Sequence, residues 1–223
     1  MEAIYPISMA EMCERYKKLY TGAVGDILDK RGYRDQILPY YINPIRNDML
    51  IAGPAFTGYG EPHNDPTEND THMRLAMLEE ITPHCISVWA THGNFSAAHW
   101  GEIMSTAARE RGCAGAVLDG GVRDTSFILE MNFPVFCRFK CSASSIGRWS
   151  IRKFQVPILI GQSQIAPGDF IIGDIDGVVV IPQAVAYEVL TEAEVISALE
   201  REMRTQLRKG ARITEVYKKY GSF

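Results

Sequence analysis

Apolar and polar residues alternate along this chain with a period that changes several times, and each change predicts a helix or a strand. Apolar side chains recur at helical spacing in residues 8–19, 21–30 and 72–80. Short, mainly apolar runs typical of buried strands lie at residues 49–59, 85–90, 135–139, 157–160, 170–173 and 177–181. The polar segment 60–71 predicts a loop. This order predicts a mixed α and β protein in which helices cover a sheet.

The region between residues 93 and 124 combines a helix, a strand and a polar pair. Residues 97–111 predict a helix that begins near Gly101 and ends at Gly112. Its expected apolar face is formed by Ile103, Met104, Ala107 and Ala108. A buried strand at residues 114–118 and a tight loop at 119–121 are expected next, then Arg123 and Asp124, and a short helix at 125–131. Ligands of layered α/β proteins bind where strands end, so a site is expected here.

The residue types in this region suit a small carboxylate and a hard metal ion. The backbone N–H groups of Glu102, Ile103 and Met104 lack partners within the helix, and a glycine at position 101 lets an anion approach them. Arg123 presents a planar fork to a carboxylate or keto oxygen, whereas Asp124 offers oxygen to Mg²⁺ or Mn²⁺. An Arg-Asp pair after a turn is also a common surface ion pair, and the residues alone leave both interpretations open.

Other polar motifs favour structural roles. The Pro167-Gly168-Asp169 sequence predicts a turn whose aspartate bonds the backbone. Asp174 and Asp176 have the spacing of metal ligands, but a D-x-D-G sequence between two apolar runs also predicts a hairpin, which we favour.

Three further kinds of site find little support. Cys137 and Cys141 lack a second Cys or His pair at zinc-site spacing, and the five scattered histidines contain no H-E-x-x-H motif. The glycines at 120 and 121 match neither phosphate-binding loop pattern, which argues against a nucleotide cofactor or a methyltransferase. No G-x-S-x-G sequence of a serine hydrolase occurs.

Composition and charge favour a compact cytoplasmic protein. The 223 residues are 46% hydrophobic and 22% charged, which predicts a single domain over residues 1–223 with a helical tail at 183–223. A net charge of −4 argues against nucleic-acid partners, and the absence of a long apolar run or secretory signal argues against a membrane partner. Five irregularly spaced cysteines are typical of reduced thiols.

Four sequence blocks resemble the RraA-like superfamily. They are Gly101-Glu102-Ile103-Met104, Asp119-Gly120-Gly121-Val122-Arg123-Asp124, Pro167-Gly168-Asp169 and Asp174-Ile175-Asp176-Gly177-Val178, with weaker similarity at residues 21–29 and 52–55. The resemblance covers nearly the whole chain. It implies an α/β fold of the swivelling β/β/α type, an α-β-β-α sandwich with a C-terminal helical tail. It departs from the family pattern at Thr91-His92-Gly93-Asn94, where an Asp-Gly sequence is usual.

The resemblance implies a class II, metal-dependent aldolase of the 4-hydroxy-4-methyl-2-oxoglutarate or 4-carboxy-4-hydroxy-2-oxoadipate type. Such a carbon-carbon lyase cleaves a 4-hydroxy-2-oxo acid to pyruvate and a second oxo acid. Residues 101–104 then bind the pyruvate carboxylate, Arg123 contacts the keto oxygen, Asp124 anchors Mg²⁺ or Mn²⁺ and Glu102 orients its water shell. A lysine Schiff base is disfavoured because neither Lys140 nor Lys153 lies in a matched motif.

Two other functions remain open at this point. Oxaloacetate decarboxylase uses the same enolate chemistry, and a ribonuclease E-binding regulator belongs to the same superfamily. Retention of Asp124 favours catalysis, because the regulators generally lack it.

The tail carries apolar residues at helical spacing beside many charges, so it packs either on its own domain or on another copy. The resemblance implies a trimer or hexamer in which Glu200 reaches a neighbour's Arg123 and Asp124.

Overall fold

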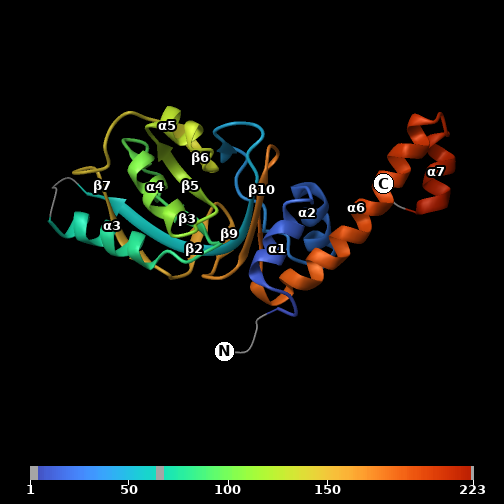
Figure 1. The fold of residues 1–223 in the computed structure, drawn as a ribbon, viewed down its shortest axis with the longest axis horizontal. Coiled ribbons are helices and arrows are strands. Elements are labelled where there is room, and N and C mark those ends of the chain that lie inside the picture. Colours follow the sequence, from blue (N-terminus) through green and yellow to red (C-terminus); the bar gives the residue numbers. More distant parts are fainter. Residues whose placement is uncertain (1–4, 64–67, 222–223) are drawn as a thin grey trace.

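The computed structural model describes residues 5–63 and 68–221. Its helices are α1 Met9–Tyr16, α2 Thr21–Lys30, α3 Glu68–Glu80, α4 Glu102–Glu110, α5 Thr125–Glu130, α6 Ala186–Arg208 and α7 Ile213–Tyr220, with a short 3₁₀ helix at Gln183–Val185 (Figure 1). Its strands are β1 Asn43–Pro44, β2 Ile51–Pro62, β3 Ile86–Ala90, β4 Ala98–Trp100, β5 Gly115–Val122, β6 Val135–Lys140, β7 Trp149–Phe154, β8 Ile158–Ile160, β9 Ser163–Ile165, β10 Phe170–Asp174 and β11 Gly177–Ile181.

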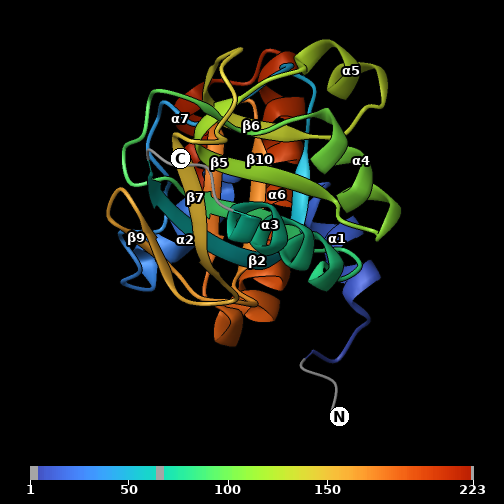
Figure 2. The same cartoon turned by 90° about the vertical axis from the view of Figure 1, so that its left-hand side faces the viewer.

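The long strand β2 joins two parts of one sheet, whose main order in the described chain is β1-β6-β5-β3-β2-β10-β11. Residues 51–54 of β2 pair antiparallel with β10, whereas residues 55–59 pair parallel with β3. The same strand then pairs antiparallel with β7 at its far end. Figure 2 shows the bend of β2 that brings the two parts face to face. Strands β3, β5 and β6 are mutually parallel, so their carboxyl ends meet at one edge.

Alternating side chains along the strands divide the interior into three hydrophobic layers. In β10, Phe170 and Ile172 pack against α1, α2 and α6, whereas Ile171 faces the core between the two parts of the sheet. In β5, Val117 faces that same central core, and Leu118 faces the helices α3, α4 and α5 on the other side. This period of two buries both faces of both parts. The predicted α-β-β-α sandwich is therefore confirmed.

Several predicted elements have the expected limits. Helix α2 occupies residues 21–30 as predicted. Helix α1 begins after Ser8, whose hydroxyl accepts the N–H of Glu11 at 3.1 Å, but it ends at Tyr16, before the predicted end at residue 19. The predicted hairpin is formed by β10 and β11, with Asp174 opposite Gly177. The Asp174 carboxylate accepts the N–H and the hydroxyl of Thr21, both at 2.8 Å, and thus caps α2. Asp169 accepts the N–H groups of Ala166 and Gln183, as expected of a turn residue.

Other predictions were wrong in their limits. The expected loop at 60–71 is partly strand and partly helix, because β2 continues to Pro62 and α3 begins at Glu68; residues 64–67 lie outside the described residues. Strand β5 continues to Val122, so Asp119, Gly120 and Gly121 belong to a strand instead of a loop. Strands β1, β4, β7 and β9 were not predicted. Three of them pair with strands distant in sequence, β1 with β6, β4 with β5 and β7 with β2, whereas β9 pairs with its neighbour β8.

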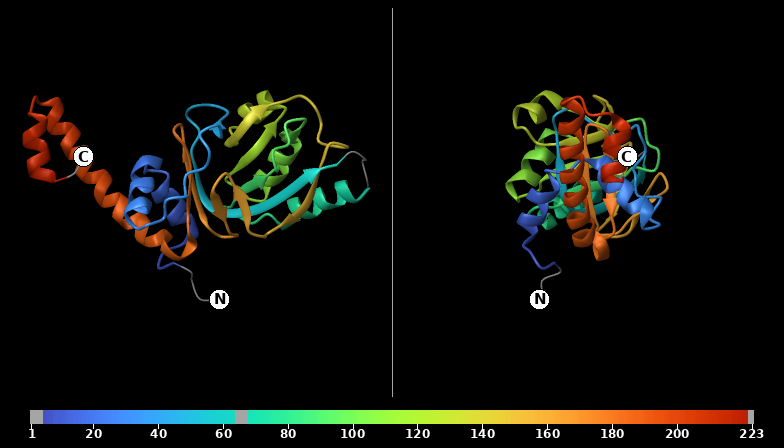
Figure 3. Two further views of the ribbon diagram at one scale, coloured as in Figure 1. Left: turned by 180° about the vertical axis from the view of Figure 1, so that it is seen from behind. Right: turned by 90° about the vertical axis from the view of Figure 1, so that its right-hand side faces the viewer.

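The C-terminal tail is helical, as predicted, and its two halves differ in environment. Val189, Leu190 and Ala193 pack in the core beside α1 and α2, whereas Val195 and Leu199 further along α6 are exposed. Figures 1 and 3 show the end of α6 and all of α7 projecting from the sandwich. Among the described residues, no helix is long and apolar enough to cross a membrane.

Candidate functional site

The amino end of α4 follows β4 directly and carries no capping side chain. Gly101 is the N-cap residue, with an extended backbone and no capping side chain. Ser105 fixes the turn from the buried side, because its N–H and its hydroxyl both donate to the Gly101 carbonyl at 3.0 Å. The Trp100 indole N–H donates to the Ser105 hydroxyl at 2.8 Å. The first N–H groups of α4 therefore point to the space in front of the helix, where an anion is favoured.

Arg123 and Asp124 lie directly beside this helix start. The Arg123 N–H donates to the Trp100 carbonyl at 3.0 Å, and its Nε lies 3.3 Å from Asp124 Oδ2. Both side chains are about two-fifths exposed, at 42% and 41%. Asp124 has a left-handed backbone, φ 56°, at the start of α5. A β-carbon on Gly101 would lie 2.9 Å from Asp124 Oδ2, so the glycine is required for this close approach.

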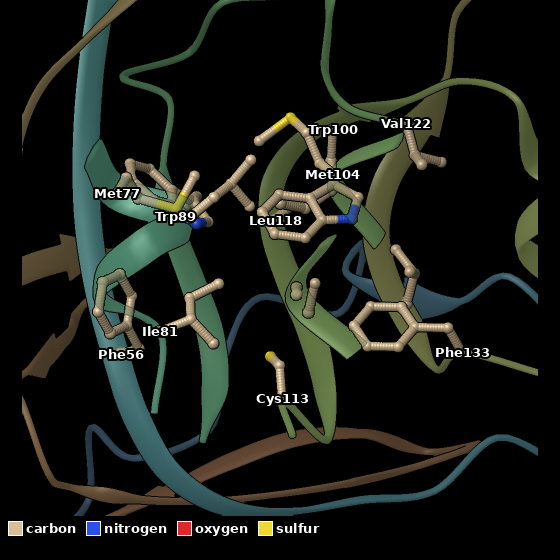
Figure 4. Packing of buried hydrophobic residues seen from close by; sticks show 14 of the residues in the cluster. Phe56, Met77, Ile81, Trp89, Trp100, Met104, Cys113, Leu118, Val122 and Phe133 are labelled. Carbon is tan, nitrogen blue, oxygen red and sulfur yellow. The ribbon is translucent and has the colours of Figure 1, made fainter. Parts of the chain in front are cut away.

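These groups share one cavity of about 250 Å³. Its walls come from α3, the β4–α4 turn, the end of β5 and the segment 141–148, and its lining residues include Arg74, Leu75, Leu78, Trp100, Gly101, Glu102, Ile103, Met104, Arg123, Asp124, Ser145 and Ile146. Figure 4 shows Trp100, Met104 and Val122 at one end of the core beneath it, with Cys113 at the other end. The cavity thus combines charged groups with an apolar wall.

The structure brings together most of the predicted site residues and separates one. Gly101, Glu102, Ile103, Met104, Arg123 and Asp124 all line the cavity. The Glu102 carboxylate also accepts a hydrogen bond from the Thr106 hydroxyl at 2.8 Å, so it lies along the surface of α4. Ile103 is 74% exposed, so its expected place on the buried face was wrong; Ser105 is buried instead. Glu200 lies on α6, a helix that Figure 1 shows well apart from α4, and contacts the Tyr20 hydroxyl and Arg204.

Arg74 is a cavity residue that sequence reasoning missed. Its Nη2 donates to the Ser145 hydroxyl at 3.0 Å, and Nη1 lies 3.9 Å from the Met104 sulfur. These contacts join α3 to the segment 141–148 across the cavity. Nothing in the local sequence singles out Arg74, because it is one charged residue within an ordinary polar helix.

His99, a buried residue of β4, connects β4 to β5 next to the candidate site. It is 3% exposed; its Nδ1 accepts the Gly121 N–H at 3.0 Å, and its Nε2 faces Asn94 Oδ1 at 3.2 Å. Burial, helped by the nearby charge of Arg74, lowers the pKa of His99 to about 4. A neutral ring with both nitrogens engaged is a structural residue. Gly120 is required here, since its β-carbon would lie 2.5 Å from His99 Nδ1.

Asp119 on β5 and Arg138 on β6 form a second charged pair. Arg138 Nε lies 3.4 Å from Asp119 Oδ1, and the guanidinium stacks on Tyr41 and Phe95 at 4.0 and 4.5 Å from the ring centres. Burial raises the pKa of Asp119, while Arg138 acts against that shift. This pair does not line the cavity.

The cavity offers two carboxylates, those of Glu102 and Asp124, to a divalent cation. Among the described residues, no three His, Cys, Asp or Glu side chains gather as a metal site. Mg²⁺ commonly keeps several waters and takes only one or two carboxylates from the protein. The partly exposed carboxylate of Asp124, with Glu102 in the same cavity, meets that smaller requirement. The donor set therefore fits a hydrated Mg²⁺ or Mn²⁺ and not a dry, protein-enclosed ion.

The fold is an α-β-β-α sandwich, and the start of α4, Arg123 and Asp124 line one cavity. Comparison with known families agrees with this combination of fold and site. The family model described as RraA-like, Aldolase/RraA, matches residues 21–180. The chain belongs to the RraA-like family.

Two curated relatives differ in length. The chain is 32% identical over 180 residues to the protein named "Putative 4-hydroxy-4-methyl-2-oxoglutarate aldolase" of Halalkalibacterium halodurans, covering 81% of this chain and 80% of that protein. It is 27% identical over 213 residues to protein DlpA of Legionella pneumophila, which covers 96% of this chain. This chain spans only 34% of the length of DlpA.

Two solved structures have a similar fold. A crystal structure described as that of novel cellulases from microbes associated with the gut ecosystem is 39% identical, with a TM-score of 0.86 over 91% of this chain and 90% of that chain. Streptomyces coelicolor RraAS2, described as an unusual member of the RNase ES inhibitor RraA protein family, has a TM-score of 0.78 over 90% of this chain and 98% of its own. At 24% identity, RraAS2 supports the fold alone.

Proposed function

We propose that this chain is a divalent-metal-dependent aldolase that cleaves a 4-hydroxy-2-oxo acid to pyruvate and a second oxo acid. The observation that supports it most is the meeting of the open start of α4, the Arg123 guanidinium and the Asp124 carboxylate at one cavity. The 32% identical relative, whose name describes an aldolase, supports the same reaction class.

The protein groups match the charges that this reaction develops. Cleavage of the C3–C4 bond leaves its electron pair on the pyruvate half as an enolate, whose negative charge lies mainly on the C2 oxygen. The N–H groups of Glu102, Ile103 and Met104 bind the pyruvate carboxylate. Arg123 donates to the C2 oxygen and stabilises the enolate, because its positive charge is already in place before the bond breaks. Protonation of C3 then yields pyruvate.

A bound Mg²⁺ or Mn²⁺ would supply Lewis-acid stabilisation of the developing negative charge. Asp124 would hold the ion together with water, and Glu102 would orient that water through hydrogen bonds. Arg74 adds positive charge at the opposite wall, where it can contact the carboxylate of the second oxo acid.

The C4 hydroxyl proton needs an acceptor, and we assign this role to Glu200 of a neighbouring copy. Exposed apolar residues on the projecting part of α6 support an assembly in which the tail packs on another subunit, either a trimer or a dimer of trimers. Within one chain the Glu200 carboxylate accepts hydrogen bonds from the Tyr20 hydroxyl, at the start of α2, and from Arg204, one turn further along α6.

A screen for pyruvate release tests the proposal. The purified protein is assayed with 4-hydroxy-2-oxo acids under Mg²⁺, Mn²⁺ and EDTA, and with the variants Arg123→Ala and Asp124→Asn. We expect activity that EDTA abolishes and either metal restores. Each variant should lose about 10²–10³ in rate, the usual effect of removing one transition-state charge contact. Asparagine tolerates the left-handed backbone at position 124, so loss of activity there reports the charge.

Wild-type rates in either variant would refute the site. Full activity in EDTA would instead indicate a Schiff base, with Lys140 the first candidate, because it lines a hollow beside Arg123 and Asp124.

Three control arms separate other functions. Oxaloacetate tests decarboxylation, which passes through the same enolate; a higher kcat/KM for oxaloacetate than for every 4-hydroxy-2-oxo acid would reassign the reaction. Soluble cello-oligosaccharides test the hydrolysis suggested by the description of the 39% identical structure. A pull-down with ribonuclease E tests the regulatory role that the sequence resemblance left open.

A further inference from the structure

Three large apolar side chains surround the opening of the cavity. Leu75 on α3, Ile103 on α4 and Ile146 in the segment 141–148 are 53%, 74% and 58% exposed. Solvent-exposed apolar groups that gather at one place on a surface commonly mark a binding site. These three belong to separate elements that are far apart in the sequence.

The apolar surface continues inward from this rim. Leu78, Trp100 and Met104 line the same cavity, are at most 8% exposed and belong to one hydrophobic core. Figure 4 shows Trp100 and Met104 within that core. The hydrogen bond between Arg74 and Ser145 holds α3 against the segment 141–148, which keeps Leu75 and Ile146 at the same opening. The part of a bound ligand that extends from the charged end of the cavity toward the opening therefore contacts apolar side chains.

We infer that the second oxo acid released by this enzyme carries a hydrocarbon side chain longer than methyl. The inference rests on the proposed function. The substrate is then a 4-hydroxy-2-oxo acid with a carboxylate and a hydrocarbon group on C4. Its pyruvate half lies at the start of α4 and Arg123, and its hydrocarbon group contacts Leu78, Leu75 and Ile146. The bond that breaks is still C3–C4, and the C4 hydroxyl becomes the keto group of the released acid.

The expected preference has a defined size. Full burial of one methylene group is equivalent to about a fourfold change in binding, from about 0.8 kcal/mol per CH₂. Because the rim is partly exposed, we expect a two- to fourfold gain in kcat/KM for each CH₂ added beyond methyl. The gain should stop when the chain extends past Ile146 into solvent.

The test compares C4-methyl, ethyl, propyl and butyl substrates in the holoenzyme with Mg²⁺, using pyruvate release as the readout. The same series of free 2-oxo acids is titrated by calorimetry, which measures binding without catalysis. The double variant Leu75→Ser, Ile146→Ser removes two rim contacts without touching the core. Leu159→Ser is the matched control, because Leu159 on β8 is 58% exposed and does not line the cavity.

We expect kcat/KM and affinity to rise with chain length in the wild type and in the control, and to become flat in the double variant. Equal or falling values beyond methyl in the wild type would overturn the inference. A gradient that persists in the double variant would also overturn it. If light scattering shows that this variant changes the size of the assembly while the gradient is unchanged, the rim belongs to a subunit contact and the inference fails.

Failure of the proposed reaction has a different signature. The wild type would release no pyruvate from any substrate in the series, while calorimetry still showed the chain-length gradient and its loss in the double variant. That result would refute the aldolase and retain the preference for a hydrocarbon-bearing oxo acid.

Discussion

Replacement of Gly101 by alanine should damage the site without damaging the fold. The added methyl group would lie 2.9 Å from Asp124 Oδ2 and 3.3 Å from Arg123 Cγ. Ordinary contacts of a β-carbon begin near 3.4 Å, so the Asp124 carboxylate must move by roughly 0.5 Å. The backbone of Gly101 is extended, at φ −157°, which alanine adopts without strain. The perturbation is therefore confined to the side chains at the cavity.

The expected loss follows from the size of that movement. A displacement of about 1 Å in a catalytic arrangement can cost about 10²-fold in rate, so a shift of roughly half that size should lower kcat/KM about tenfold. Exchange of an N-cap glycine for alanine costs about 0.5–1 kcal/mol, which corresponds to about 1–4 °C in Tm for a domain of this size. The assays are initial rates of pyruvate release with Mg²⁺ and thermal unfolding.

Gly22→Ala provides the matched control. Gly22 lies in α2, outside the cavity, and its added methyl group meets only the Tyr20 ring at 3.4 Å. Activity of the control should equal that of the wild type. Unchanged kcat/KM in Gly101→Ala would show that the approach of Asp124 to this turn does not matter, and an equal loss in Gly22→Ala would show that the effect is not local.

Two further predictions concern pH and assembly. Burial lowers the pKa of His99 to about 4, whereas an unfolded histidine titrates near 6.5, so between these values the unfolded chain binds the proton and stability falls as pH falls. Urea unfolding should show a loss of about 2 kcal/mol between pH 7.5 and pH 5 that His99→Gln lacks; identical pH slopes would contradict this. Inactive Asp124→Asn and Glu200→Gln proteins, refolded together, should regain part of the activity, because some sites would combine both carboxylates. A monomer by light scattering, or no recovery despite proven mixing, would restrict the site to one chain.

Short-range signals were enough for the elements whose limits were predicted well. Residues 21–30 have helical spacing, and the D-x-D-G sequence between two apolar runs forms the β10–β11 hairpin. The same holds for the start of α4 at Gly101 and for the fold class, which rests on motifs that extend along most of the chain. The single-domain interpretation of residues 1–223 and the cytoplasmic location stay predictions.

Long-range contacts explain the errors. Gly120 and Gly121 look like turn residues, but they lie in β5, because Gly121 pairs there with β4 and β6. His99 and Phe139 occupy the space that side chains at these two positions would need. Strand β7 contains Ser, Arg and Lys, and it forms because the far end of β2 offers backbone partners. Ile103 is apolar and exposed because it lies at the opening of the cavity, where the helical period cannot distinguish a ligand-facing position from a core-facing one.

The sequence by itself determined the family, the fold class and the identity of the central polar residues, because these depend on motifs and periods that neighbouring residues carry. Only the tertiary structure decided that Arg74, Leu75 and Ile146 share a cavity with Arg123, since α3 and the segment 141–148 meet there through a hydrogen bond that no local pattern encodes. It also separated Glu200 from that cavity within one chain, because α6 follows the opposite face of the sandwich and then leaves it.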